Sequence, residues 1–321
     1  LQDEATDVDR EITHNLWKHH RMLPPASRFR HYWDYVMILL TLYNFLLTPM
    51  QLGYSRGPVF RSTGDVPTTD VLLAVDCLIW VVFVCDLVVN MRTAYYDAEH
   101  ELVVSSALVW KRYCDSWFTI DLLGSLPYAL LAYIFTIGQS DPTRTLVIAV
   151  AKMPLCLRML RLSHKLDEMS STGYSHVMLQ MLAFILVAHW VGSLWWFIGV
   201  SQYEERHDPY ITPLAGALPG EIGEARFLRD GGKTWLGRVP VGSTPLSPNL
   251  THTPFEQQYV SSLYWALTTL MKTSWVGPDT VLEKVYASGG VILGVIVFAM
   301  LLGNVSAMIN SCAEATGWGR G

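Results

Sequence analysis

The final third of the sequence places a polar loop directly before a long apolar segment, and this pairing restricts the possible folds more than any other feature. Residues 291–309, VILGVIVFAMLLGNVSAMI, are almost entirely apolar, and about 20 such residues cross the roughly 30 Å hydrocarbon core of a bilayer. The preceding loop, MKTSWVGPD at 271–279, is polar, and such backbone is stable at membrane depth only inside protein or beside water. Since selectivity filters are built in this way, a pore is our first hypothesis.

The composition supports a membrane protein and argues against several other classes. Of the 321 residues, 51% are hydrophobic and 16% are charged, whereas a soluble domain has about 25% charged residues. The net charge of −5 and the lack of a basic stripe in the sequence argue against a nucleic-acid partner. The sequence has no nucleotide-binding, zinc or catalytic-triad motif. We therefore expect a membrane protein in contact with lipid, not an enzyme, with no catalytic residue and no metal or cofactor site within the chain.

Hydropathy predicts an all-α membrane protein with six transmembrane helices. The predicted spans cover about residues 35–50, 71–91, 117–137, 146–166, 177–200 and 285–309. Spans one to four form a four-helix domain (31–170), and spans five and six form a pore domain (171–312). Within the pore domain, a Gly- and Pro-rich turret (202–254) precedes a pore helix and filter (259–280), which make a re-entrant loop.

The Lys and Arg residues that flank the spans predict the orientation. Five precede the first span and three lie between the second and third, whereas the loop after the first span has two. Because basic loops stay on the cytoplasmic side, we expect segments 1–30 and 313–321 to be cytoplasmic. The turret then lies outside, where Asn249, in an Asn-Leu-Thr sequon, is a candidate glycosylation site. We expect the protein in a cell membrane, with a ciliary or flagellar membrane as one alternative.

Charged residues inside the first four spans indicate a voltage-sensor-like bundle. Asp76, Asp86 and Asp121 lie in the second and third spans, and a carboxylate at membrane depth costs about 2.5–3.5 kcal/mol unless it faces partners. The fourth span supplies five cations: Arg144, Lys152, Arg158, Arg161 and Lys165. We therefore expect the three carboxylates to be countercharges for these cations.

The spacing of the cations leaves the winding of the fourth span open. At about 100° per residue, four of them fall on one broad face of an α-helix while Lys152 points away. Lys152 joins Arg158 and Arg161 only if the segment winds as a 3₁₀ helix of about three residues per turn, and Pro154 breaks the register. Two interpretations stay open: a helix that moves with voltage, or a static ion-pair network whose end extends to lipid headgroups.

Five segments, in matching order and spacing, resemble the cyclic-nucleotide-gated and hyperpolarisation-activated channels, with their plant and ether-à-go-go-type relatives. The segments are LPPASRFRHYWD, DLVVNMRTAYYD with KRYCDSWFTIDLLGSLP, AHWVGSLWW, YVSSLYW and GVIVFAMLLGNVSAMI. The last two are most similar to the cyclic-nucleotide-gated branch. The resemblance covers about residues 23–312. It implies a four-fold cation channel in which each subunit gives a sensor bundle and a quarter of the pore.

The resemblance assigns roles to residues of the sixth span. Phe298 and Leu302 correspond to the apolar constriction that closes the pore by expelling water. Gly294 corresponds to a hinge, with helix packing as the alternative, and Asn304 near the gate is placed to bridge neighbouring subunits. Family members continue into a cyclic-nucleotide-binding domain. The resemblance therefore implies that cAMP or cGMP would act only through residues outside this chain.

The filter departs from the family pattern. The expected filter residues are Met271, Lys272, Thr273, Ser274, Trp275, Val276 and Gly277. Potassium channels carry a Thr-Val-Gly-Tyr-Gly type of loop, and cyclic-nucleotide-gated channels carry Thr-Ile-Gly followed by an acidic residue. Here the acidic position falls on Trp275. We therefore expect conduction of monovalent cations with weak selectivity, not strict selection of potassium.

Lys272 leaves alternatives to a simple homotetramer open. Four ionised lysines about 7 Å apart would repel by about 2.4 kcal/mol for each adjacent pair at an effective dielectric constant of about 20. Lys272 therefore turns toward Asp279 or Glu283, loses its proton, or comes from fewer than four subunits. In the last case the chain is a modulatory or non-conducting subunit of a heterotetramer. A basic ring that faced the axis would instead favour anions.

Overall fold

The computed structural model describes residues 18, 21–55, 68–97, 99, 101–169, 173–207, 235–237, 254–273 and 277–316. This part of the chain is helical apart from one short β-hairpin and an isolated bridge. Five helical stretches in it are long and apolar enough to cross a membrane: Arg28–Tyr54, Asp70–Met91, Phe118–Phe135, Val177–Gln202 and Val281–Asn310. They correspond to the first, second, third, fifth and sixth predicted spans.

The chain forms two compact units. The first unit is drawn from residues 1–48, 69–139 and 147–165, and the second from residues 49–68, 140–146 and 166–321. The division passes through four helices that each contribute to both units: α2 (Arg28–Tyr54), α3 (Thr68–Met91), α7 (Asp141–Ala151) and α8 (Arg158–Met169). In α2 the change of unit falls at Pro49.

The helices of the first unit carry the second and third predicted spans. The second span is α3 (Thr68–Met91), an unbroken helix. The third is divided into α5 (Phe118–Leu123) and α6 (Tyr128–Phe135). Pro127 precedes α6 and lacks a backbone N–H group, so the helix is interrupted there and restarts. Ala129, Ala132 and Ile148 form a small buried core beside α6.

A short hairpin connects the second and third spans. Its strands β1 (Tyr95–Tyr96) and β2 (Leu102–Val103) pair antiparallel, and α4 (Ser106–Ser116) follows them. The guanidinium carbon of Arg112 in α4 lies 4.1 Å from the centre of the Tyr95 ring. This cation–π contact ties α4 to β1.

The fourth predicted span consists of three pieces. They are α7, the 3₁₀ helix η2 (Met153–Leu157) and α8 (Arg158–Met169). Pro154 lies in the first turn of η2, where its missing N–H group costs little. The fourth span is not among the five apolar candidates within the described residues, because it is divided into short pieces and carries several cations.

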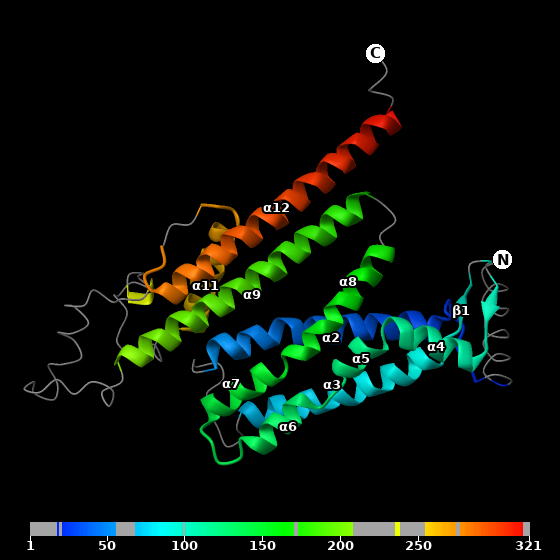
Figure 1. Cartoon of the computed structure of the whole chain (residues 1–321), viewed down its shortest axis with the longest axis horizontal. Coiled ribbons are helices and arrows are strands. Elements are labelled where there is room, and N and C mark those ends of the chain that lie inside the picture. The colour runs from blue at the N-terminus through cyan, green and yellow to red at the C-terminus, as the bar shows by residue number, and fades with distance from the viewer. Residues whose placement is uncertain are drawn as a thin grey trace, which may run out of the picture. The chain divides into compact units, whose positions relative to one another are not determined.

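The second unit contains the fifth span, the pore helix and the sixth span. These are α9 (Gly173–His207), α11 (Phe255–Leu270) and α12 (Val281–Thr316), and Figure 1 shows them side by side. Two glycines permit this close packing. A Cβ atom on Gly192 would lie 2.9 Å from the Ser262 carbonyl oxygen, and one on Gly294 would overlap the Leu270 backbone.

Stacked aromatic rings form the core of the second unit. Trp195 of α9 and Trp265 of α11 stack with their ring centres 3.7 Å apart and their planes at 3°. Trp235, in the short helix η3 (Trp235–Gly237), stacks on Trp195 at 5.2 Å, and Tyr286 of α12 stacks on it at 6.2 Å. One aromatic column therefore joins a turret residue to the fifth span, the pore helix and the sixth span.

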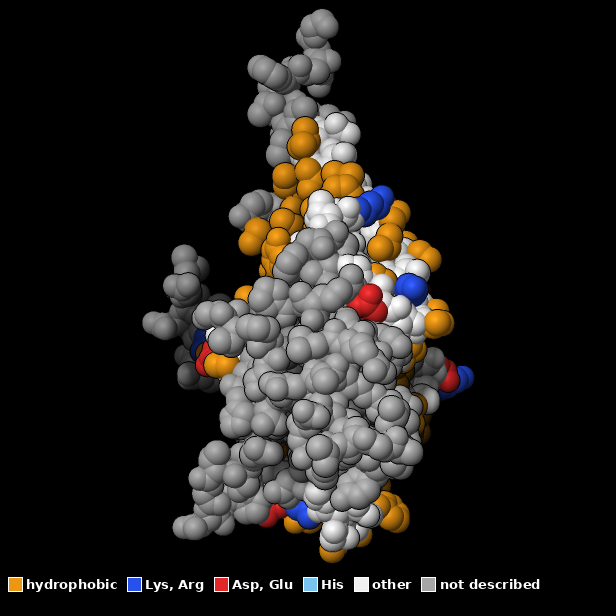
Figure 2. All heavy atoms as spheres, turned by 90° about the vertical axis from the view of Figure 1, so that its left-hand side faces the viewer, with side chains coloured by type: hydrophobic (Ala, Val, Ile, Leu, Met, Phe, Trp, Pro, Cys, Tyr) orange, Lys and Arg blue, Asp and Glu red, His pale blue; other side chains and the backbone are white. Residues whose placement is uncertain are grey.

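The sixth span is poorly covered within a single chain. Only 6% of its apolar window is buried, against 39% for the first span. Ile292, Val295, Ile296 and Met300 are among its exposed hydrophobic side chains. Figure 2 shows hydrophobic side chains gathered on the upper part of the described surface, where α12 lies in Figure 1. A membrane protein with such a helix needs lipid or further protein chains around it.

Candidate functional site

Three ion pairs connect α3 and α5 with the fourth span inside the first unit. Lys152 Nζ lies 2.7 Å from Asp76 Oδ1 and 2.9 Å from Asp76 Oδ2. The pairs that follow along the fourth span join Arg158 to Asp86 at 3.5 Å and Arg161 to Asp121. Five of the six side chains are nearly inaccessible to solvent and Arg161 is mostly buried. Each charge therefore has an opposite charge as partner in a poorly solvated region.

The spacing of residues on α3 places its polar side chains on one face. Asp76, Phe83, Asp86 and Asn90 are separated by seven, three and four residues, which is the repeat that returns to the same side of an α-helix. All four are buried. Beyond its first turn, helix α3 is otherwise apolar, so this buried stripe of Phe83 and three polar side chains indicates where the fourth span packs.

Arg158 lies at the centre of the network. Its guanidinium carbon is 4.0 Å from the centre of the Phe83 ring, a cation–π distance. Its Nη2 atom donates to Ser125 Oγ at 2.6 Å and to the Phe83 carbonyl oxygen at 3.3 Å. Gly124 gives the side chain room, because a Cβ atom there would lie 2.6 Å from Arg158 Cγ. The break between α5 and α6 thus provides the surface on which Arg158 rests.

The Arg161 end of the network is closed by polar side chains. Arg161 Nη2 donates to Asn90 Oδ1 at 3.0 Å, and the Tyr113 hydroxyl donates to Asp121 Oδ2 at 2.7 Å. Burial, and then the negative charge of Asp121, raise the pKa of the Tyr113 hydroxyl above its ordinary value. The hydroxyl therefore stays protonated and remains a donor.

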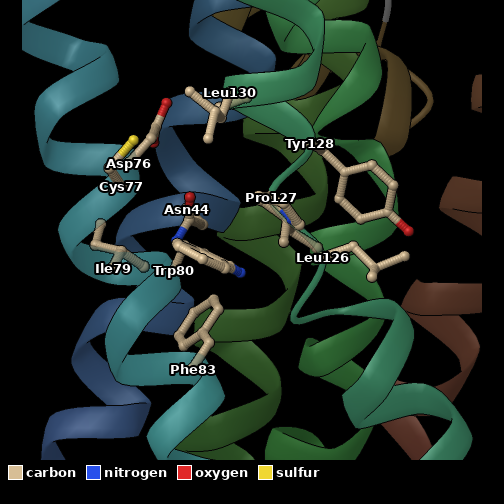
Figure 3. Close-up of a pocket in the computed structure, with 12 residues that line it drawn as sticks. Asn44, Asp76, Cys77, Ile79, Trp80, Phe83, Leu126, Pro127, Tyr128 and Leu130 are labelled. Carbon is tan, nitrogen blue, oxygen red and sulfur yellow. The ribbon is translucent and has the colours of Figure 1, made fainter.

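Two small cavities adjoin the network. The first, of about 20 Å³, is lined by Asn44, Asp76, Trp80 and Phe83 among others. Figure 3 shows Asp76 at one end of it, Phe83 at the other and Trp80 between them. The second, of about 40 Å³, is lined by charged side chains that include Arg158. Both exceed the roughly 10–15 Å³ that one water needs, so each cavity has room for water beside the charged side chains.

The structure therefore brings together most of the charges that we selected from the sequence. The three carboxylates contact Lys152, Arg158 and Arg161, and the five residues of η2 lie between the first two of these cations. A 3₁₀ helix in this segment is the winding that we expected to place Lys152 on the same side as Arg158 and Arg161. Arg144 lies in the first turns of α7, outside the three pairs. Lys165 belongs to α8, but its side chain is outside the part that the structure describes.

Several side chains of the network were not predicted from the sequence. They are Phe83, Asn90, Tyr113 and Ser125. The spacing from Asp76 along α3 was a usable signal for Phe83 and Asn90. No local pattern marks Tyr113 or Ser125, because each joins the network through the packing of another helix.

The pore helix ends in a tight capping motif that contains Lys272. The Lys272 N–H donates to the Thr269 carbonyl at 3.1 Å, and the Thr273 N–H donates to the Thr268 carbonyl at 2.7 Å. Lys272 has a φ angle of 61°. These are the bonds and the left-handed residue of a Schellman motif, in which the left-handed position is usually Gly. The cation is thus held beside the negative end of the pore-helix dipole.

Lys272 does not make the ion pairs that we considered from the sequence. Its side chain is exposed, and no ion pair joins it to a described residue. Glu283 is fully buried, and its Oε2 accepts from the Asp279 and Thr280 N–H groups at 2.7 and 3.2 Å. The Glu283 N–H in turn donates to Thr280 Oγ1 at 3.1 Å. This capping box starts α12, so Glu283 caps the helix and does not neutralise Lys272.

Parts of the predicted filter and turret lie outside the described residues. They are Ser274, Trp275, Val276 and the sequon residue Asn249. Met271, Thr273 and Gly277 are described and exposed in the single chain.

The predicted gate residues occupy one side of the sixth span. Phe298 and Leu302 are four residues apart in α12, so they share a face, and Leu302 is 51% exposed. Helix α12 is continuous through Gly294, which packs against α11. Asn304 Nδ2 donates to Gln180 Oε1 of α9 at 2.6 Å. In this structure Asn304 therefore links the sixth span to the fifth span of its own chain.

Comparison with known proteins places this arrangement in a family. The model of the ion transport protein family matches residues 30–317. The voltage-gated inwardly rectifying potassium channel KCNH6 of Rattus norvegicus is 32% identical over 295 residues, 90% of this chain and 28% of that protein. The potassium voltage-gated channel unc-103 of Caenorhabditis elegans is 28% identical over 303 residues, 93% of this chain and 34% of that protein. The chain spans about a third or less of the length of these relatives.

The relatives also show which part of the family resemblance drawn from the sequence is supported. The similar proteins named above are potassium channels, and they do not specifically indicate the cyclic-nucleotide-gated or hyperpolarisation-activated branch. The match to the family model extends over most of the chain. The chain therefore belongs to the ion transport protein family, and it is a channel protein and not an enzyme.

Proposed function

We propose that this chain is one subunit of a four-fold cation channel whose first unit responds to membrane voltage. The observation that carries the proposal is the ladder of three buried ion pairs around Phe83. A cation that exchanges one carboxylate for the next along such a ladder crosses part of the membrane without losing a partner. Each charge that crosses the whole field contributes about 2.3 kcal/mol per 100 mV.

A moving sensor is favoured over a static network by two features of the ladder. First, Arg158 rests on the Phe83 ring and donates hydrogen bonds to a carbonyl and a hydroxyl oxygen in addition to its pair with Asp86, so its binding site does not depend on one carboxylate. Second, one cavity is lined by Asp76 and Phe83, and the other is lined by the charged groups of Asp86, Asp121, Arg158 and Arg161. Water in them would confine the membrane field to a short distance around Phe83.

The pore is proposed to conduct monovalent cations with weak selectivity. The relatives named above are potassium channels, but the stretch from Met271 to Gly277 contains a lysine and only one glycine. Lys272 lies at the carboxyl end of the pore helix, where its charge offsets the negative end of the helix dipole. This lowers the attraction for a cation at that point. Phe298 and Leu302 are proposed to form the apolar gate.

Two features support assembly from four chains. The sixth span has only 6% of its apolar window buried in the single chain. Met271, Lys272 and Thr273 of the filter loop are also exposed. Both would be covered in a ring with the sixth spans at the axis. The exposed Lys272 also supports a second candidate, a modulatory subunit in a heterotetramer, because fewer than four lysines would then face one another.

Recording from the purified protein alone in a planar bilayer tests the proposal. Under asymmetric potassium chloride, we expect the reversal potential to shift from zero toward the equilibrium potential of potassium and away from that of chloride. Replacement of potassium by sodium on one side should move that potential by only a few millivolts. Absence of current from the homomeric protein, with current restored by a co-purified channel subunit, would favour the modulatory role. A reversal potential shifted toward the equilibrium potential of chloride would overturn the proposal.

A further inference from the structure

A hydrogen bond between two amide side chains joins the fifth and sixth spans on the carboxyl side of Gly294. Asn304 Nδ2 of α12 donates to Gln180 Oε1 of α9 at 2.6 Å. Both residues lie inside stretches that are long and apolar enough to cross a membrane. An amide without a partner is unfavourable in hydrocarbon, because no water is there to replace the lost hydrogen bond. The two amides therefore stabilise each other between the helices.

Gln180 stands out from the residues around it on α9. Met178, Met181 and Leu182 are exposed apolar side chains, whereas Gln180 is polar and partly buried. Contact with lipid would favour a fourth apolar residue at this position. A link between two helices accounts for the amide, because polar side chains inside membrane spans commonly bond across helices.

The stretch of α12 that follows Gly294 packs weakly within the chain. At Gly294 the helix lies directly against the Leu270 backbone. Beyond it, none of residues 295–310 is buried, and a Cβ atom on Gly303 would meet no atom within 4 Å. The bond of Asn304 to α9 is therefore a specific attachment of a stretch that is otherwise poorly held.

The bond lies on the side of α12 opposite the proposed gate. At about 100° per residue, Asn304 is about 200° around the helix from Leu302 and about 240° from Phe298. When Asn304 faces α9, the two gate side chains consequently point away from α9. In the proposed ring the sixth spans line the axis, and the fifth spans lie outside them. A bond that draws α12 toward α9 thus draws the gate side chains away from the axis.

We propose that Gln180 is a positioning residue for the gate, and that its bond to Asn304 favours the open pore. The inference rests on the proposed function, in which Phe298 and Leu302 close the pore at the axis. To close, this stretch of α12 moves toward the axis and away from α9, so the bond breaks. An average interhelical hydrogen bond in a membrane changes an equilibrium constant about threefold. Four subunits that move together multiply this to roughly 80-fold.

Open probability in a planar bilayer at a fixed voltage tests the proposal. Three variants remove the bond: Gln180→Met, which keeps the length of the side chain without its amide, Asn304→Leu, and the two combined. A fourth variant exchanges the amides, as Gln180→Asn with Asn304→Gln, and keeps the total length of the pair. The matched control is Asn310→Leu, which removes another exposed amide of α12.

We expect each single variant to lower the ratio of open to closed channels by about threefold for each subunit. The combined variant should fall no further than the single ones, because all three lose the same bond. The exchange variant should restore most of the ratio, which a role in packing alone would not allow. The control should change it less than about twofold. If Asn304→Leu does not assemble, Gln180→Met and the shorter Gln180→Asn should each show the loss.

The position of the gate can also be followed without ion current. With 4-trifluoromethylphenylalanine in place of Phe298, the areas of the fluorine NMR signals report the two positions of this side chain. Gln180→Met should move signal area toward the closed position by the same factor. If the protein carries no current and the areas still shift in this way, the proposed conduction fails and the positioning role of Gln180 stands.

Three results would overturn the proposal. One is an unchanged open-to-closed ratio, with unchanged fluorine signal areas, in Gln180→Met. Another is additive loss in the combined variant with no rescue by the exchange, because the two residues would then act separately. The third is a higher open-to-closed ratio in the single variants, because the bond would then hold the pore closed.

Discussion

At the scale of single residues, Lys272 shows how local backbone geometry and charge act together. It occupies the left-handed position of the motif that ends the pore helix, where a side chain costs about 1–2 kcal/mol relative to Gly. The residue is exposed at the place where an ion would pass in the proposed pore. A lysine is thus held in a conformation that disfavours it, at a site where its charge affects permeation.

Lys272→Gly should therefore change stability and permeation together. We expect the free energy of unfolding to rise by about 1 kcal/mol, because Gly adopts positive φ without strain. Cation current should also rise, because the charge at the end of the pore helix is lost. Thermal denaturation and single-channel recording measure the two effects. Lys284→Gln, which removes an exposed cation of α12 with ordinary helical backbone, is the control. A less stable Lys272→Gly protein would contradict the strain argument.

Gly124 makes a second prediction at this scale. A Cβ atom there would lie 2.6 Å from Arg158 Cγ, so Gly124→Ala must displace the side chain from the Phe83 ring. Overpacking of this kind typically costs about 1–3 kcal/mol, and we expect a lower denaturation midpoint. Gly289→Ala, at a helical position with open space, should be neutral or stabilising. Equal stability of the two variants would show that Arg158 is not held as described.

At the scale of elements, the sequence predicted the helices better than the contacts between them. Apolar length alone located five spans, and the cost of buried charge selected Asp76, Asp86 and Asp121 as partners of the fourth span. The Schellman motif at Lys272 was not predicted, because a cation in place of Gly gives no sequence signal for it. The Arg158–Ser125 contact was not predicted either. This contact depends on how the break in the third span packs against the fourth span, and a hydropathy pattern carries no information about that packing.

The sixth span carries the gate prediction. Phe298→Ala combined with Leu302→Ala should leave the channel open to ions under conditions where the wild type is closed. Shorter side chains on the shared face of α12 widen the constriction and let it fill with water. Closed-state current in a bilayer measures the effect, and Ile309→Ala, at another exposed apolar position of α12, is the control. A double variant with the same closed-state current as the wild type would show that Phe298 and Leu302 do not form the gate.

At the scale of the whole molecule, the single chain leaves its sixth span largely uncovered. Helix α12 has 6% of its apolar window buried, so its stability in a membrane depends on what surrounds it. Asn304 bonds to Gln180 of its own chain, so in the proposed tetramer apolar packing and the filter loops would hold the subunits together. Native mass spectrometry in mild detergent should show the mass of four chains. Monomers and dimers alone would contradict the four-fold ring.

Conductance measured against voltage tests the central claim most directly. The purified protein, in a bilayer, should conduct more at one polarity of the steady-state voltage than at the other, with a steepness that reports the charges moved. Arg158→Gln combined with Asp86→Asn removes one pair of the ladder without leaving a buried carboxylate unpaired. The account predicts a shallower curve, by up to about one elementary charge per subunit, and an unchanged curve for Lys111→Gln. A wild-type conductance independent of voltage, or equal steepness in the double variant, would contradict it.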